Sequence, residues 1–113
     1  MSEMTMEREA KILESAVETF GANAQVVVAI EECSELQKAL TKWLRYQSRD
    51  VDCETAELLT HNILEEMADV SIMLNQLALI FGDANEDEVA KLERLERRLE
   101  AHVVEKVGYV LSE

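Results

Sequence analysis

The sequence predicts an all-α protein with four helices. Three observations favour this class: the chain has no proline and only three glycines, helix-forming residues dominate it, and its apolar residues recur every three or four positions. It is 48% hydrophobic and 4% aromatic. A length of 113 residues suits a single domain, 1–113.

The three glycines are expected to mark helix ends, because glycine is enriched just past a helix C-terminus. The predicted helices run from Ser2 or Thr5 to Phe20, from Asn23 as N-cap to about Gln47, from a cap at Asp52 or Thr55 to Phe81, and from Glu86 to about Lys106. Residues 108–113 are expected to form a tail.

The second and third predicted helices hold about 25 residues each, and each spans close to 40 Å. Paired across a short loop, such helices form an antiparallel hairpin that seldom buries its apolar face alone. The fourth helix has a narrow apolar stripe, close to a coiled-coil seam, at Leu92, Leu95, Leu99 and Val103. We therefore expect a four-helix bundle that is completed by self-association.

The net charge of −13 argues against two classes of partner. Nucleic-acid binding needs clustered Lys and Arg, and an anionic membrane surface would repel this chain. No apolar run reaches the ~18 residues of a membrane span, and the first residues show no signal-peptide pattern. A cytoplasmic protein is expected, with Cys33 and Cys53 as reduced structural thiols.

Each of the two long helices carries an acidic pair among apolar residues. Glu32 and Glu35 are three positions apart, as are Glu66 and Asp69, so each pair shares a helix face. In an antiparallel hairpin the four carboxylates can converge, and two such charges at ~4 Å repel by about 4 kcal/mol at an effective dielectric near 20. A bound hard cation, Mg²⁺ or Mn²⁺, would compensate. The alternative is that these acids are solvated helix faces.

Basic and aromatic residues near these pairs suggest a phosphate-containing ligand. Lys38 and Lys42 continue the acidic row of the second helix, and Lys91 and Arg94 form a similar row on the fourth. All four can instead form ordinary ion pairs with neighbouring Glu residues. Trp43, the only tryptophan, is either a core residue or a platform for a nucleobase.

The acidic pairs resemble a known motif. "EECSE" at residues 31–35 and "EMAD" at residues 66–69 resemble the EExxE…ExxD motif of the MazG-like group of all-α nucleoside triphosphate pyrophosphohydrolases. The flanking stretches "VAIEECSELQKALTKW" and "NILEEMADVSIMLNQL" are similar as well. The resemblance covers about residues 22 to 100.

The resemblance implies hydrolysis of a nucleoside triphosphate between its α- and β-phosphates. Under it, the Mg²⁺ ligands would be Glu32, Glu35, Glu66 and Asp69. Glu31 would be an outer-shell acid or the base that orients the attacking water, so the catalytic set would be Glu31, Glu32 and Glu35. The outgoing pyrophosphate would be steadied by Lys38, Lys42 and either Lys91 or Arg94, and Trp43 would contact the base. Members of this group are dimers or tetramers.

A second hypothesis remains open. The chain would then be a non-enzymatic helical oligomer, an interaction or regulatory module whose acids are surface charge. The two hypotheses differ in whether Glu32, Glu35, Glu66 and Asp69 converge in one cleft.

Overall fold

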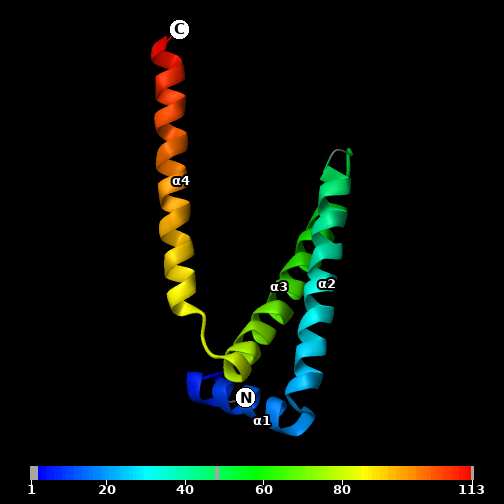
Figure 1. The fold of residues 1–113 in the computed structure, drawn as a ribbon. Helices are drawn as coiled ribbons and strands as arrows, with labels where there is room; N and C mark the ends of the chain where they lie inside the picture. The colour runs from blue at the N-terminus through cyan, green and yellow to red at the C-terminus, as the bar shows by residue number, and fades with distance from the viewer. Residues whose placement is uncertain (1–2, 48, 113) are drawn as a thin grey trace. The chain divides into compact units, whose positions relative to one another are not determined.

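The structure is a computed structural model that describes the backbone of residues 3–47 and 49–112, and the side chains of these ranges as far as residue 107. The chain is all-α, as predicted. Its four helices are α1 (Met6–Phe20), α2 (Ala22–Gln47), α3 (Cys53–Phe81) and α4 (Asn85–Ser112) (Figure 1). The chain divides into two units, Met1–Gly82 and Asp83–Glu113. The expectation of a single domain stays a prediction.

The first unit is an antiparallel hairpin of α2 and α3 with α1 packed against both helices (Figure 1). The end of α2 and the start of α3 lie together at the tip of this hairpin (Figure 1). Among the described residues, the buried apolar side chains are Leu13 of α1, Ala29 of α2, and Leu59 and Met73 of α3. The core therefore lies along the α2–α3 contact and under α1.

Two helices begin at side-chain caps, each at one of the two positions that the sequence offered for the helix start. Ser2, the alternative to Thr5, lies outside the described residues. The Thr5 hydroxyl accepts a hydrogen bond from the Arg8 backbone N–H at 3.0 Å. The Asp52 carboxylate accepts one from the Thr55 backbone N–H at 2.7 Å. Each cap satisfies a backbone donor that the first turn of a helix cannot pair internally. Thr55 itself lies inside α3 and is not the cap.

The predicted cap at Asn23 is wrong, because a single residue joins α1 to α2. Gly21 has φ +89°, donates its N–H to the Val17 carbonyl at 2.8 Å and accepts the Gln25 N–H at 3.2 Å. It closes α1 and opens α2 at the same time. Asn23 therefore falls within the first turn of α2.

The predicted tail is also wrong at residues 108–112, since α4 continues through Gly108 to Ser112, and Glu113 lies outside the described residues. A glycine inside a helix costs only about 1 kcal/mol relative to alanine, and no proline follows to stop the helix. Every residue of α4 whose side chain is described is exposed. This helix forms the second unit by itself.

Large apolar side chains remain exposed on the first unit. Ile30 is 65% exposed, Leu44 62% and Leu64 56%. Self-association would cover such surface, and it stays a prediction. Within the described residues, no helix combines the length and the apolar character that a membrane span requires. Cys33 and Cys53 are free, as expected, but both are exposed rather than packed in the core.

Candidate metal centre

Three of the predicted carboxylates meet between the two long helices. Glu32 of α2 and Glu66 and Asp69 of α3 each offer one oxygen, and these oxygens all lie within 4.8 Å of one another. Glu32 and Glu66 are half-buried, whereas Asp69 is exposed. Helical spacing puts Glu66 and Asp69 on one face of α3, and the antiparallel hairpin brings that face to Glu32. These three residues are called the acidic group below.

Ionisation of Glu32 and of Glu66 is disfavoured. Partial burial raises the pKa of Glu32 above its ordinary value of 4.5, and the charge of Asp69, a hydrogen bond with Asp69 and the charges of Glu66 and Glu35 raise it further. Burial also raises the pKa of Glu66, followed by the charges of Asp69, Glu35 and Glu65. Loss of hydration and like-charge repulsion act in the same direction.

No protein cation neutralises this group among the described residues. The salt bridges near it involve other acids: Lys38 Nζ lies 3.3 Å from Glu35 Oε1, and His61 Nε2 lies 2.9 Å from Glu65 Oε1. Clustered carboxylate oxygens without a Lys or Arg partner are the ligand set that a hard divalent cation takes. The acidic group therefore has the chemistry and the spacing to hold a metal ion.

Glu35 lies beside the acidic group but outside the 4.8 Å limit. Its side chain is exposed and paired with Lys38. Its charge is still close enough to raise the pKa values of both Glu32 and Glu66. A cavity of about 190 Å³ lies here, called the lysine cavity below, and it is lined by Glu35, Lys38, Ala39, Lys42, Leu59, Asn62 and Glu66. Both predicted lysines of α2 thus line a cavity that reaches the acidic group.

The other predicted site residues lie apart from the acidic group. Glu31 is exposed and outside it. Trp43 lines a second cavity of about 240 Å³ at the hairpin tip. Lys91 and Arg94 are exposed residues of α4, in the second unit, and their assignment to the site stays a prediction.

Some residues of these cavities were missed by the sequence reasoning. Asn62 lines the lysine cavity four positions before Glu66, so its place on the same face of α3 followed from helical spacing. Tyr46 and Arg49 line the second cavity together with Trp43. Tyr46 lies three positions after Trp43, so helical spacing could have indicated that both residues lie on one face of α2. Arg49 lies beyond the end of α2, where periodicity gives no guide.

No family model, curated protein or solved structure matches this chain.

Proposed function

We propose that the chain is a Mg²⁺-dependent nucleoside triphosphate pyrophosphohydrolase of the MazG-like type. It would cleave a ribo- or deoxynucleoside triphosphate to the monophosphate and pyrophosphate. The observation that carries the proposal is the acidic group: oxygens of Glu32, Glu66 and Asp69 lie within 4.8 Å of one another, beside a cavity lined by lysines. The type of reaction is inferred from the resemblance of residues 31–35 and 66–69 to the EExxE…ExxD motif.

Glu32, Glu66 and Asp69 would hold the ion, Mg²⁺ or Mn²⁺, with Glu35 as the fourth carboxylate. A bound Mg²⁺ supplies neutralising charge for the phosphates and a water of lowered pKa. With Glu35 as a ligand, its salt bridge with Lys38 would be given up, and the lysine would be free to bind phosphate. Glu31, one position before Glu32, or Glu35 itself accepts the proton of the attacking water. The proposed catalytic set is Glu31, Glu32 and Glu35.

The proposed substrate contacts are inferred from the residues that line the cavities. Lys38 and Lys42 hold the phosphate chain, because both line the cavity that Glu66 and Glu35 share. Trp43 contacts a nucleobase, since it is 38% exposed and lines a cavity rather than the core. Lys91 and Arg94 of α4 are further candidates for the phosphates.

The exposed apolar side chains of the first unit support a homodimer or homotetramer. Only four apolar residues are buried among those described, while Ile30, Leu44 and Leu64 are each more than half exposed. Association of copies would cover this surface. The negative charge excludes nucleic acid and membrane from the proposed partners, and the proposed location is the cytoplasm.

The test is a pyrophosphate-release assay over canonical and modified nucleoside triphosphates, with Mg²⁺ or with EDTA. We expect metal-dependent release of pyrophosphate by the wild type and none by Glu35→Gln. The matched control is Glu57→Gln, which changes an exposed glutamate of the same hairpin away from the acidic group. Equal helix content by circular dichroism shows that all three proteins are folded.

The exposed apolar surface also favours the second candidate, a non-enzymatic oligomer. That candidate requires an oligomer by analytical ultracentrifugation together with no pyrophosphate release and no Mg²⁺ binding. Metal-dependent release that persists in Glu35→Gln would contradict the role of Glu35, while the proposed reaction itself would stand.

A further inference from the structure

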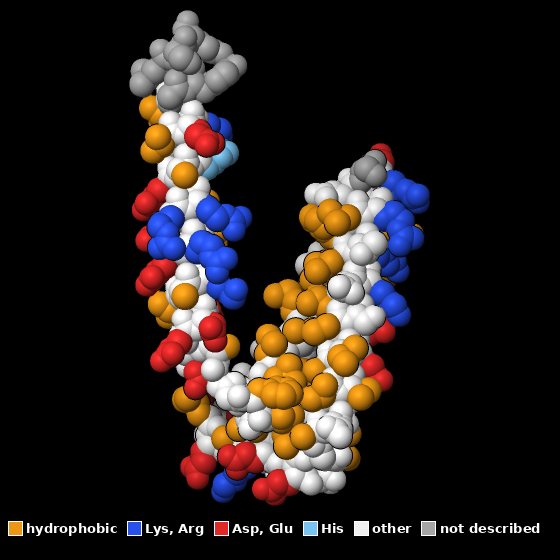
Figure 2. All heavy atoms as spheres, viewed as in Figure 1, with side chains coloured by type: hydrophobic (Ala, Val, Ile, Leu, Met, Phe, Trp, Pro, Cys, Tyr) orange, Lys and Arg blue, Asp and Glu red, His pale blue; other side chains and the backbone are white. Residues whose placement is uncertain are grey.

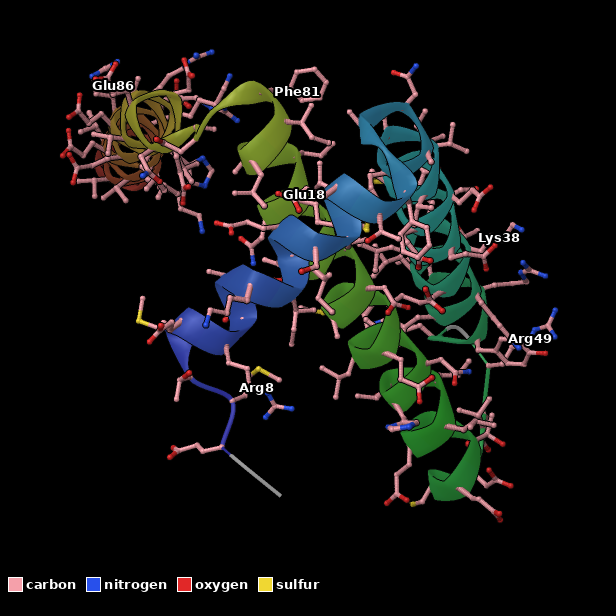
Figure 3. The ribbon with its side chains drawn as sticks, turned by 90° about the horizontal axis from the view of Figure 1, so that it is seen from below. Arg8, Glu18, Lys38, Arg49, Phe81 and Glu86 are labelled. Atoms are coloured by element: carbon pink, nitrogen blue, oxygen red, sulfur yellow. The ribbon has the colours of Figure 1, made fainter. Side chains whose placement is uncertain are left out.

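The cations of the α2–α3 hairpin all lie on one side of the acidic group. α3 contains no Lys or Arg, and α2 contains none before Lys38. From the acidic group toward the tip, Lys38, Lys42, Arg45 and Arg49 follow at spacings of four, three and four, which defines the basic row. Figure 2 shows the Lys and Arg side chains of the hairpin along its upper right edge, and Lys38 and Arg49 project from one side of it in Figure 3.

This one-sided charge sets the polarity of a bound nucleotide. The pyrophosphate part carries most of the negative charge of a nucleoside triphosphate, so it lies against the basic row. The nucleoside that is cleaved off would then lie on the other side of the acidic group, toward the start of α2, so the base proposed to contact Trp43 would belong to a nucleoside at the opposite end of the phosphate chain. A group that binds beyond the basic row would therefore be attached to the end of the phosphate chain opposite to the cleaved nucleoside.

The basic row is longer than a pyrophosphate needs. From Lys38 to Arg45 it covers seven residues of helix, about 10 Å. Two phosphates joined through one oxygen would be held by Lys38 and Lys42 together with the metal ion. The remainder of the row continues toward the tip and reaches an aromatic cavity.

That cavity, called the tip cavity below, has a volume of about 240 Å³ and shares Leu59 with the lysine cavity. Its lining includes Trp43, Tyr46, Gln47, Arg49 and Thr60. The Arg49 guanidinium lies 5.4 Å from the centre of the Tyr46 ring. The Thr60 hydroxyl donates to the Ala56 carbonyl at 3.0 Å, so its lone pairs remain able to accept a hydrogen bond.

The tip cavity has the chemistry of a nucleobase site. Aromatic side chains and stacked guanidinium groups bind the flat faces of bases, and amide and hydroxyl groups read their edges. Each cavity alone is smaller than the ~300 Å³ at which ligand pockets begin, and the two neighbours together fall within the usual range. A ligand that fills both carries phosphates at the lysines and a base at Tyr46.

We infer that the tip cavity binds a second nucleoside at the far end of the phosphate chain, so that the preferred substrates are dinucleoside polyphosphates; this rests on the proposed function. In the reaction, the oxygen of water bonds to the α-phosphorus of the first nucleoside. The bridging oxygen leaves with the β-phosphorus, and a carboxylate takes the water proton. A dinucleoside tetraphosphate plus water then gives one nucleoside monophosphate and one nucleoside triphosphate.

The fluorescence of Trp43 reports on the tip cavity, because it is the only tryptophan of the chain. The probes are dinucleoside tetraphosphates of adenosine, guanosine, cytidine, uridine and thymidine, each compared with the nucleoside 5′-tetraphosphate of the same base. The latter has the same number of phosphates and no second nucleoside. In the Glu35→Gln variant with Mg²⁺, we expect at least one dinucleotide to change the Trp43 emission and its mononucleotide counterpart to leave it unchanged.

Steady-state kinetics give the second readout. For the best dinucleotide, we expect a KM about tenfold below that of the matching nucleoside triphosphate, and loss of that advantage in Tyr46→Ala. The KM for the triphosphate stays unchanged in this variant. The control is Phe20→Ala, which removes an exposed aromatic ring outside both cavities and should affect neither substrate.

The outcomes separate this inference from the proposed function. If the mononucleotide changes the Trp43 emission equally, or if Tyr46→Ala raises the KM for the triphosphate as well, the cavity holds the base of the cleaved nucleotide and the inference is wrong. If nothing is cleaved but only dinucleotides change the emission, the proposed function fails and the binding site stands. If nothing is cleaved and nothing changes the emission, both are wrong.

Discussion

One carboxylate oxygen of Glu32 on α2 and one of Asp69 on α3 lie within 4.8 Å of each other, although neither residue has a Lys or Arg partner among the described residues. Partial burial and then the charge of Asp69 raise the pKa of Glu32. Without an ion, the folded chain therefore keeps like charges together that the unfolded chain separates. This cost makes the site testable through stability as well as activity.

The first prediction concerns the pH dependence of stability in metal-free protein. Because the pKa of Glu32 is raised in the folded state, its contribution to stability is fully present below the unfolded pKa of about 4.5. That contribution is lost as the pH rises through the folded pKa. Glu32→Gln resembles the protonated acid and removes this loss. We expect its Tm to exceed that of the wild type by a few degrees at neutral pH, with the difference closing below about pH 4.5.

The matched control for this prediction is Glu31→Gln, which changes an exposed glutamate outside the acidic group. Its Tm should follow that of the wild type across the same pH series in EDTA. If the Glu32→Gln protein is no more stable than the wild type at neutral pH, the charge of Glu32 does not destabilise the metal-free protein, and the prediction is wrong.

The second prediction is that Mg²⁺ stabilises the folded chain. A ligand bound only to the native state at about 100 times its Kd adds about 2.7 kcal/mol, which is roughly 10 °C in Tm for a chain of this size. Asp69→Asn should lose most of this shift, and Glu57→Gln should retain it. The measurement is a thermal melt in Mg²⁺ against NaCl of equal ionic strength. Equal shifts with the two salts would indicate charge screening alone.

The third prediction separates phosphate binding from surface ion pairing. Lys38 pairs with Glu35 at 3.3 Å and Lys11 pairs with Glu7 at 3.9 Å, and both lysine side chains are about three-quarters exposed. Such pairs add at most about 1 kcal/mol, so Lys38→Met and Lys11→Met should have similar Tm values. Only Lys38 lines the lysine cavity, so only Lys38→Met should raise the KM for nucleotide, by about tenfold. A KM that is equal in the two variants would exclude the phosphate role of Lys38.

The helix ends and the acidic pairs could be predicted because they depend on local sequence. Thr5 and Asp52 cap helices through bonds to residues three positions later, and Gly82 ends α3 through a positive φ that other residues rarely adopt. The i,i+3 spacing likewise fixed Glu66 and Asp69 on one face. Gly21 and Gly108 show the limit: the same residue type joins two helices at one position and lies inside a helix at the other.

The composition of the acidic group required the structure, because the register between two helices depends on their packing. Glu32 and Glu35 share a face of α2, yet only Glu32 comes within 4.8 Å of both acids of α3. The position of Leu59 between the two cavities likewise follows from packing at the tip. Helical spacing alone predicts neither which carboxylates meet nor which residue the two cavities share.

The fourth prediction tests the cap of α3 by acid titration. Hydrogen bonds from the Thr55 side chain and then from its backbone lower the pKa of Asp52 below 3.8. A lowered pKa contributes stability above the unfolded pKa, and this stability is lost as the pH falls through the folded pKa. Asp52→Asn keeps a capping oxygen without titrating, so its Tm relative to wild type should rise as the pH drops below about 3.8. Asp52→Ala should lower the Tm by a few degrees at neutral pH. Identical acid melts of wild type and Asp52→Asn would contradict the cap.

The fifth prediction uses two glycines in opposite settings. Gly21 has φ +89° and ψ 153°, a region that is essentially restricted to glycine, and a Cβ there would meet no atom within 4 Å. Gly21→Ala should therefore lose about 1–3 kcal/mol through backbone strain alone. Gly108 lies within α4, where alanine is favoured by about 0.5–1 kcal/mol. Gly108→Ala should accordingly raise helix content by circular dichroism. If Gly108→Ala instead lowered helix content, α4 would end before that residue, as the sequence first indicated.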